Sequence, residues 1–278
     1  MKQLGVLSLI SLLLIGCQSG QPQVPTYPGY TLVFADEFEG TSLNTANWSY
    51  REGDGCPDLC GWGNKELQWY RPENTTVSGG NLIITAKEES YGGRDYTSSQ
   101  IISRHKQDFK YGRIEASIKL PRGDGMWPAF WMMSSDDVYG TWAASGEIDI
   151  MEAKNTPMEI RGNLHFGGQY PDNAKTGSSA YADGSDFSQD YHLYSIEWDP
   201  KEIRWYCDNN LYKSTDVWWT GSKEDNGTFP APFDQRFYIL LNVAVGGTYM
   251  DCFVPECITA EFPQKMYVDY VRVYQKTD

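Results

Sequence analysis

Gly146-Glu147-Ile148-Asp149-Ile150-Met151-Glu152 decides the fold, because its three carboxylates alternate with large apolar side chains. On a helix, at about 100° per residue, the three acids would point in different directions. On a strand, Glu147 and Asp149 share one face, and Met151, as one extra bulged residue, returns Glu152 to that face. The stretch therefore predicts a bulged strand with three carboxylates along one face and apolar side chains on the other.

Three acids on one strand face point to glycosidic chemistry. Like charges a few Å apart raise the pKa of at least one group, which leaves a mixture of protonated acid and ionised base. A retaining glycosidase uses that mixture, with a carboxylate nucleophile and a protonated carboxyl about 5 Å apart across the sugar C1. The alternative is a solvated acidic strand face, and the surroundings of the motif have to decide between the two.

The N-terminus predicts export. Met1-Lys2-Gln3 precedes an apolar run, Leu4 to Ile15, which is too short to span a bilayer and is typical of a signal peptide. Because Gly16 precedes Cys17 as in bacterial lipoproteins, we expect residues 1–16 to be removed, Cys17 to be lipidated and residues 17–28 to form a flexible tether. An ordinary signal peptide is the alternative. We expect a cell-envelope lipoprotein at the outer membrane or cell surface, with residues 29–278 as its catalytic domain.

The composition favours a neutral polysaccharide as partner. A net charge of -14 argues against nucleic acid, since phosphate binding needs clustered Lys and Arg. The 10 Trp and 19 Tyr offer ring faces on which sugars stack, although aromatic rings also fill β cores. We expect a monomer that meets the membrane only through its lipid anchor.

The other cysteines divide by context. Cys56 and Cys60, and likewise Cys252 and Cys257, are close enough in sequence to form disulfides in an oxidising compartment. A four-cysteine zinc site is the less favoured alternative, because these spacings are not the C-x-x-C pattern of zinc sites. Cys207 is left without a partner.

Alternation of period two recurs along the chain and predicts an all-β sandwich. Residues 113–120 place apolar side chains on one face and polar ones on the other. Further strands are predicted at 81–87, 192–198, 203–206, 237–245 and 267–274, between segments rich in Gly, Asp, Asn and Pro. Since long amphipathic helical patterns are absent, we expect a jelly roll with a concave glycan-binding groove.

Residues 126–131 predict an aromatic strand beside the acids. Trp127 and Trp131 share a strand face about 13 Å apart, which suits two sugar rings, although core packing is the alternative. Pro128 indicates an edge strand or a bulged strand, because proline cannot donate to a β-ladder.

The ordered motifs of the chain resemble glycoside hydrolase family sixteen, in its bulged, laminarinase-like form. The E-x-D-x-x-E motif at 147–152 is accompanied by blocks at 61–70, 111–115, 126–131, 163–167, 196–199 and 241–247, which cover nearly the whole chain after Tyr30. The resemblance implies a retaining double displacement without a catalytic cofactor. It assigns Glu147 as nucleophile and Glu152 as acid and base, with Asp149 between them to keep Glu152 protonated and to orient the nucleophile.

The resemblance also implies binding residues. Those expected along the sugar subsites are Asn64, Arg104, Arg113, Trp127, Trp131, His165 and Asn242. Many relatives have Arg near position 100, where this chain has Gln100, which leaves the linkage preference open. A structural Ca²⁺ on the convex side is expected at Glu37, the Gly80 carbonyl and Asp269, since Ca²⁺ prefers oxygen ligands.

The expected activity is endo-hydrolysis of β-1,3 or mixed β-1,3-1,4 glucans such as laminarin, lichenan and cereal β-glucan. One alternative is an agar hydrolase of the same fold. Another is a non-catalytic, glycan-binding surface lipoprotein, which could have lost acids that this chain retains. The strongly acidic composition disfavours sulfated galactans, which suit a basic groove.

Overall fold

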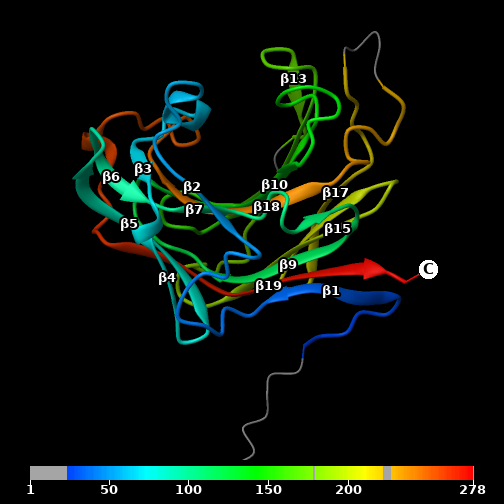
Figure 1. Ribbon diagram of the computed structural model, residues 1–278, viewed down its shortest axis with the longest axis horizontal. Helices are drawn as coiled ribbons and strands as arrows, with labels where there is room; N and C mark the ends of the chain where they lie inside the picture. Colours follow the sequence, from blue (N-terminus) through cyan, green and yellow to red (C-terminus); the bar gives the residue numbers. More distant parts are fainter. Residues whose placement is uncertain (1–23, 178, 222–226, 278) are drawn as a thin grey trace, which may run out of the picture.

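Two stacked β-sheets form the molecule, and their facing sides enclose the core (Figure 1). The computed structural model describes residues 24–177, 179–221 and 227–277. Helical structure in these ranges is limited to three short 3-10 segments, at Cys60–Gly63, Pro72–Asn74 and Pro255–Cys257. No helix of the described part is long and apolar enough to cross a membrane. The expected all-β jelly-roll sandwich is therefore confirmed.

The concave sheet carries the acidic strand near its middle, and raised loops flank it on both sides (Figure 1). Its strands, in spatial order, are β13 (Asn173–Lys175), β12 (Ile160–Gly167), β11 (Glu147–Glu152), β10 (Met126–Ser134), β18 (Phe237–Val245), β7 (Gln100–Ile102) and β2 (Ser49–Arg51). Two short strands lie off this path: β14 (Ser179–Tyr181) pairs with β12, and β8 (Asp108–Phe109) pairs with β18.

The convex sheet lies behind it. Its strands, in spatial order, are β17 (Asn210–Thr215), β16 (Ile203–Cys207), β15 (His192–Trp198), β9 (Gly112–Lys119), β19 (Gln264–Lys276), β5 (Asn81–Tyr91), β6 (Arg94–Ser98) and β3 (Gln68–Tyr70). Strand β1 (Tyr30–Asp36) pairs with β19, and β4 (Thr75–Ser78) pairs with β5.

The predicted strands are all present. The ranges 147–152, 192–198 and 237–245 match β11, β15 and β18 to the residue, while β5, β10 and β19 run further than predicted. The prediction of an edge position for Pro128 is wrong, because β10 lies between β11 and β18. The alternative, a bulge in β10, is not observed either, because β10 pairs with β18 in unbroken register and the residue left unpaired between β10 and β11 is Ile150 of β11.

Alternation fills the core from both sheets. Ile148 on β11, Phe130 on β10 and Leu241 on β18 face Ile114 and Ile196 of the convex sheet, and all five are fully buried in one cluster. Each such side chain contributes about 1.5–3 kcal/mol through burial. The opposite faces of β10, β11 and β18 are thereby left to point into the concavity.

The predicted flexible tether ends earlier than residue 28. The Tyr27 ring packs edge-on against Tyr274 at 4.9 Å, and its hydroxyl donates to Glu115 at 2.7 Å. Residues 27 and 28 therefore belong to the folded domain, because a docked aromatic ring anchors the backbone next to it. The signal peptide, Cys17 and the tether up to residue 23 lie outside the described residues.

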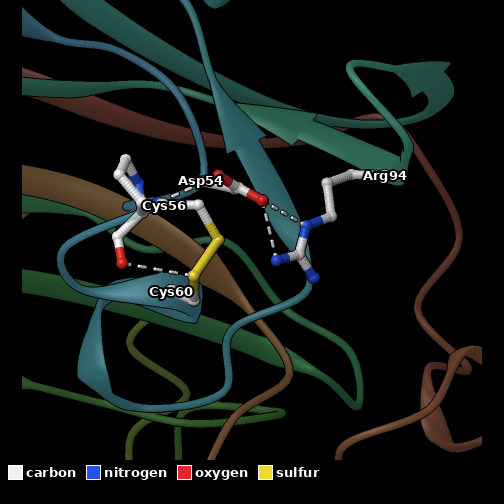
Figure 2. Close-up of a disulfide and its surroundings, with 5 residues drawn as sticks. Asp54, Cys56, Cys60 and Arg94 are labelled. Atoms are coloured by element: carbon white, nitrogen blue, oxygen red, sulfur yellow. Dashed lines mark hydrogen bonds and ion pairs between the residues drawn. A yellow bond between two sulfur atoms is a disulfide. The ribbon is translucent and has the colours of Figure 1, made fainter.

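Both predicted disulfides are confirmed. Cys56 and Cys60 form one bridge, in a loop that an ion pair between Asp54 and Arg94 ties to β6 (Figure 2). The second bridge joins Cys252 to Cys257. The two braced loops meet where the Thr248 amide donates to the Asn64 carbonyl at 2.8 Å, which fixes one wall of the concavity. Cys207 is a buried free thiol.

Candidate active site

A β-bulge brings the three acids of β11 onto the concave face. Against β10, Asp149 pairs with Trp131 and Met151 with Phe130, so Ile150 has no partner on that side. Ile150 and Met151 both point into the core, at 1% and 0% exposure. The predicted bulge is therefore present, although the unpaired residue on the β10 side is Ile150 rather than Met151.

Glu152 lies at the end of β11 between two donors. Trp127 Nε1 donates to its Oε1 at 3.1 Å and Asn163 Nδ2 to its Oε2 at 3.1 Å. Burial raises the pKa of Glu152, and the Glu147 charge adds to the increase, while the Asn163 hydrogen bond and His165 oppose it. A carboxyl in this setting holds its proton to higher pH than an exposed glutamate.

Asp149 is the most buried of the three acids, at 3% exposure. Burial raises its pKa well above the usual range, and the charges of Glu152 and Glu147 add to that effect. Its Oδ2 lies 3.5 Å from His165 Nε2 and has no closer donor. Protons on Asp149 and Glu152 therefore depend on each other.

Glu147 lies at the start of β11 and is held by two rings. Trp142 Nε1 donates to its Oε2 at 2.8 Å, and His165 Nε2 lies 3.6 Å from its Oε1. Burial opposes protonation of His165, but the charges of Glu147 and Asp149 prevail and raise its pKa to about 9. The predicted place of His165 beside the acids is thus observed, and an imidazolium faces two carboxylates at neutral pH.

Trp127 and Trp131 both point into the concavity from β10, as predicted. Trp127 contacts Glu152 directly, whereas Trp131 Nε1 donates to Asn242 Oδ1 at 2.7 Å. Asn242 in turn donates to the Tyr70 hydroxyl at 3.1 Å. Asn242 therefore orients the Trp131 ring through a hydrogen-bond network.

Glu66, which no sequence pattern singled out, lies at the centre of that network. Its carboxylate accepts from Asn64 at 3.2 Å, Gln68 at 2.6 Å and Tyr70 at 3.2 Å, and burial raises its pKa to about 7. The predicted residue Asn64 is thus at the concave face, on the disulfide-braced loop. Trp142 was also missed, because it belongs to an irregular loop that follows no period.

Arg113 is not a groove residue, and this prediction is wrong. It lies on β9 in the convex sheet at 3% exposure, where its Nε donates to Glu115 at 2.8 Å. Its guanidinium also lies 3.6 Å from Glu197 and stacks over the Tyr27 ring at 4.3 Å. The block at 111–115 is therefore a structural ion-pair cluster on the face opposite the acids.

Arg104 also departs from its predicted role. Its guanidinium donates twice to the Ser135 carbonyl, at 3.0 and 2.8 Å, and pairs with Asp137 at 3.1 Å. These bonds tie the loop after β10 to the end of β7, so the donors of Arg104 serve the loop. None of its hydrogen bonds reaches the acids of β11.

The predicted calcium ligands fit a cation only in part. Both carboxylate oxygens of Glu37 accept from Arg272, at 2.7 and 2.8 Å, so this side chain is engaged elsewhere. The Asp269 side chain is exposed, and burial together with the Glu37 charge raises its pKa. Gly80 lies in the turn between β4 and β5 with φ +73°. Of the two predicted carboxylates, Asp269 is the one without an ion pair among the described residues, although a hydrogen bond with Ser117 lowers its pKa.

A jelly-roll sandwich with three acids on its concave sheet defines a glycoside hydrolase that works through carboxylates. The chain belongs to the glycosyl hydrolases family 16, whose pattern matches residues 63–249.

Relatives support this placement. A glucan endo-1,3-beta-glucosidase A1 from Niallia circulans is 42% identical over 92% of the chain, which spans 39% of that protein. A beta-glucanase from Rhodothermus marinus is 39% identical over 94% of the chain and 91% of its own length. The laminarinase catalytic domain from Thermotoga maritima superposes with a TM-score of 0.77 at 35% identity, over 90% of this chain and 99% of that one.

Proposed function

We propose that the protein is a retaining endo-β-glucanase that hydrolyses β-1,3 glucans and mixed β-1,3-1,4 glucans. The observation that carries this proposal is the unequal environment of the acids, in which Glu152 is half-buried with a raised pKa while Glu147 faces two ring donors. The relatives from Niallia and Rhodothermus, a glucan endo-1,3-beta-glucosidase and a beta-glucanase, support the glucan substrate.

In the first step, Glu147 attacks the sugar C1 while Glu152 gives its proton to the departing glycosidic oxygen. The bond between C1 and that oxygen breaks, and an ester forms between C1 and Glu147. Asp149 acts on both partners, because its protonation and that of Glu152 depend on each other and its position between the glutamates orients the nucleophile.

In the second step, Glu152 takes a proton from water, whose oxygen bonds to C1 and releases Glu147. The two inversions retain the anomeric configuration. His165 stabilises the negative charge on Glu147 and Asp149 in the free enzyme, since its imidazolium lies 3.6 and 3.5 Å from their carboxylates. Trp127 and Trp131 are the ring faces on which we place the sugars. The carboxylates supply this chemistry without a cofactor.

A product profile tests the proposal. Laminarin, a cereal mixed-linkage glucan and agarose are each incubated with the wild type, and reducing ends and the anomeric proton of the first product are followed by NMR. We expect β-configured oligosaccharides from the two glucans and none from agarose. Products from agarose alone would favour the galactan alternative, and no products from any of the three would favour a glycan-binding protein.

We also propose export with a lipid anchor at Cys17, supported by the lipoprotein-like N-terminal sequence and by two disulfides in the folded part. Labelled palmitate should enter the wild type and not Cys17→Ser.

A structural Ca²⁺ at Asp269 is a further proposal, since a cation would relieve its repulsion with Glu37. Ca²⁺ should then raise the melting temperature of the wild type more than that of Asp269→Asn.

A further inference from the structure

Two side chains of the convex sheet cross the core to reach the backbone behind the acids. Trp205 on β16 is fully buried, and its Nε1 donates to the Asp149 carbonyl at 2.7 Å. Lys213 on β17 donates from Nζ to the Gly162 carbonyl of β12 at 2.6 Å and to Thr176 Oγ1 at 2.8 Å. Both contacts come from residues that are distant in sequence from the acid motif.

These contacts fall at the bulge. The ladder between β11 and β12 pairs Asp149 with Asn163 and Glu152 with Arg161, so Gly162 stands opposite Ile150 and Met151. A bulge disrupts the local ladder and leaves backbone groups to find other partners. A buried carbonyl without a partner is costly, and Trp205 and Lys213 satisfy one carbonyl on each strand.

Gly162 makes room for the indole. A Cβ at this position would lie 2.3 Å from Trp205 Cδ1 and 2.6 Å from its Nε1, too close for any side chain unless the ring shifts. The neighbouring residue Asn163 donates to Glu152. The ring therefore packs directly behind the strand segment that orients the acid and base residue.

Lys213 completes the support. It is 8% exposed, its ammonium lies 4.9 Å from the Trp205 ring centroid, and no carboxylate of the described residues lies within 4.0 Å of it in an ion pair. Burial lowers its pKa to about 8, so it carries its charge at neutral pH. Its donors instead reach backbone and hydroxyl oxygens around the bulge, which makes it a cross-link between the two sheets.

We propose that Trp205 and Lys213 are positioning residues that hold the bulge of β11 and thereby set the separation between Glu147 and Glu152. This inference rests on the proposed hydrolase function. The bulge lies between the two glutamates, and a one-residue change of register would turn Glu152 toward the core. Because a retaining glycosidase needs its carboxyl groups about 5–5.5 Å apart, a relaxed bulge reduces catalysis before it reduces sugar binding.

Trp205→Phe tests the proposal, with Trp198→Phe as a matched control. Trp198 is also a buried tryptophan of the convex sheet, and its Nε1 donates to a backbone carbonyl, that of Phe233, at 3.0 Å. Each variant removes one indole donor and keeps a ring. We expect Trp205→Phe to lower kcat on laminarin by about tenfold or more with KM nearly unchanged, because misplacement by a fraction of an Å slows the chemical step.

Trp198→Phe should leave kcat at the wild-type value, with a comparable loss in melting temperature. Equal kcat values for the two variants would overturn the proposal. An inactive wild type would instead refute the proposed hydrolase function, so the two failures are distinguishable.

If Trp205→Phe does not fold, two lysine variants test the positioning role instead. Lys106 also donates to two backbone carbonyls, of Thr45 at 2.6 Å and Trp48 at 2.7 Å, but away from the acids. Lys213→Met should lower kcat several-fold, whereas Lys106→Met should not. Equal kcat for both lysine variants would count against the positioning role.

Discussion

Strands β9 and β11 both carry charged residues on one face, yet they serve opposite purposes. On β9 the charges alternate in sign, so Arg113 and Glu115 neutralise each other in a buried pair at 2.8 Å. On β11 the three acids have one sign of charge, and His165 lies 3.6 and 3.5 Å from two of them, Glu147 and Asp149. Paired charges stabilise the sandwich, whereas crowded like charges hold a proton in place for chemistry.

The largest expected effect is on the β11 side. Glu147→Gln and Glu152→Gln should each lower kcat by roughly 10³-fold while the melting temperature stays close to the wild type, because each removes a reacting group. Reducing-sugar assays on laminarin measure the rates. Glu197→Gln on the convex sheet is the control, and a similar loss of activity in that variant would erase the distinction between the two faces.

On the β9 side, Arg113→Met should cost stability and spare activity. Glu115 is 0% exposed, and removal of its guanidinium partner leaves a buried charge whose cost is about 3–5 kcal/mol. Urea unfolding followed by tryptophan fluorescence measures the loss in the free energy of unfolding. The kcat of the variant, measured below the unfolding transition, should match that of the wild type. A lowered kcat with unchanged stability would indicate that Arg113 is a groove residue after all.

A pH profile sharpens the role of His165 beside the acids. Glu152 must be protonated, so kcat/KM falls as pH rises through its raised pKa. His165 lowers the pKa of Glu152, and therefore His165→Gln should move the alkaline limb to higher pH. His192→Gln, which removes a partner of Asp208 on the convex sheet, should leave the limb in place. An alkaline limb at lower pH in His165→Gln would contradict the effect assigned to His165 on the pKa of Glu152.

A smaller effect is expected where the N-terminal segment covers the β9 pair. Tyr27→Ala removes a hydroxyl donor to Glu115 and a ring beneath Arg113, which should lower the free energy of unfolding by about 1–2 kcal/mol. The exposed Tyr170, at 75% exposure, is the comparison, and its replacement by Ala should not affect stability. Equal stability of the two variants would mean that residues 24–28 are dispensable.

The smallest effect is expected at Arg104. Its donors are used by Ser135 and Asp137, so Arg104→Ala should change kcat/KM on laminarin by no more than about twofold. A tenfold increase in KM would place its guanidinium on the sugar and reverse the structural assignment.

Local patterns predicted much of this molecule. Strands at 147–152, 192–198 and 237–245 and both disulfides follow from alternation and short cysteine spacings. The resemblance placed Arg113 in the groove, and alternation did not correct this, because it says which face of a strand is polar and not which sheet the strand joins. Trp142 escaped notice because it lies in an irregular loop with no period, although it is close to Glu147 in sequence. Glu66 escaped notice because its network reaches Trp131 through Asn242, a residue distant in sequence.

The amino-acid order of β11 by itself determined that three carboxylates share a face with one bulge between them, because strand geometry has a period of two and one extra residue resets it. The tertiary structure alone decided what surrounds them. Pairing of β11 with β12 set His165 opposite Glu147, and the packing of two sheets set Trp205 against the Asp149 carbonyl. Such contacts depend on long-range pairing, which a local pattern does not encode.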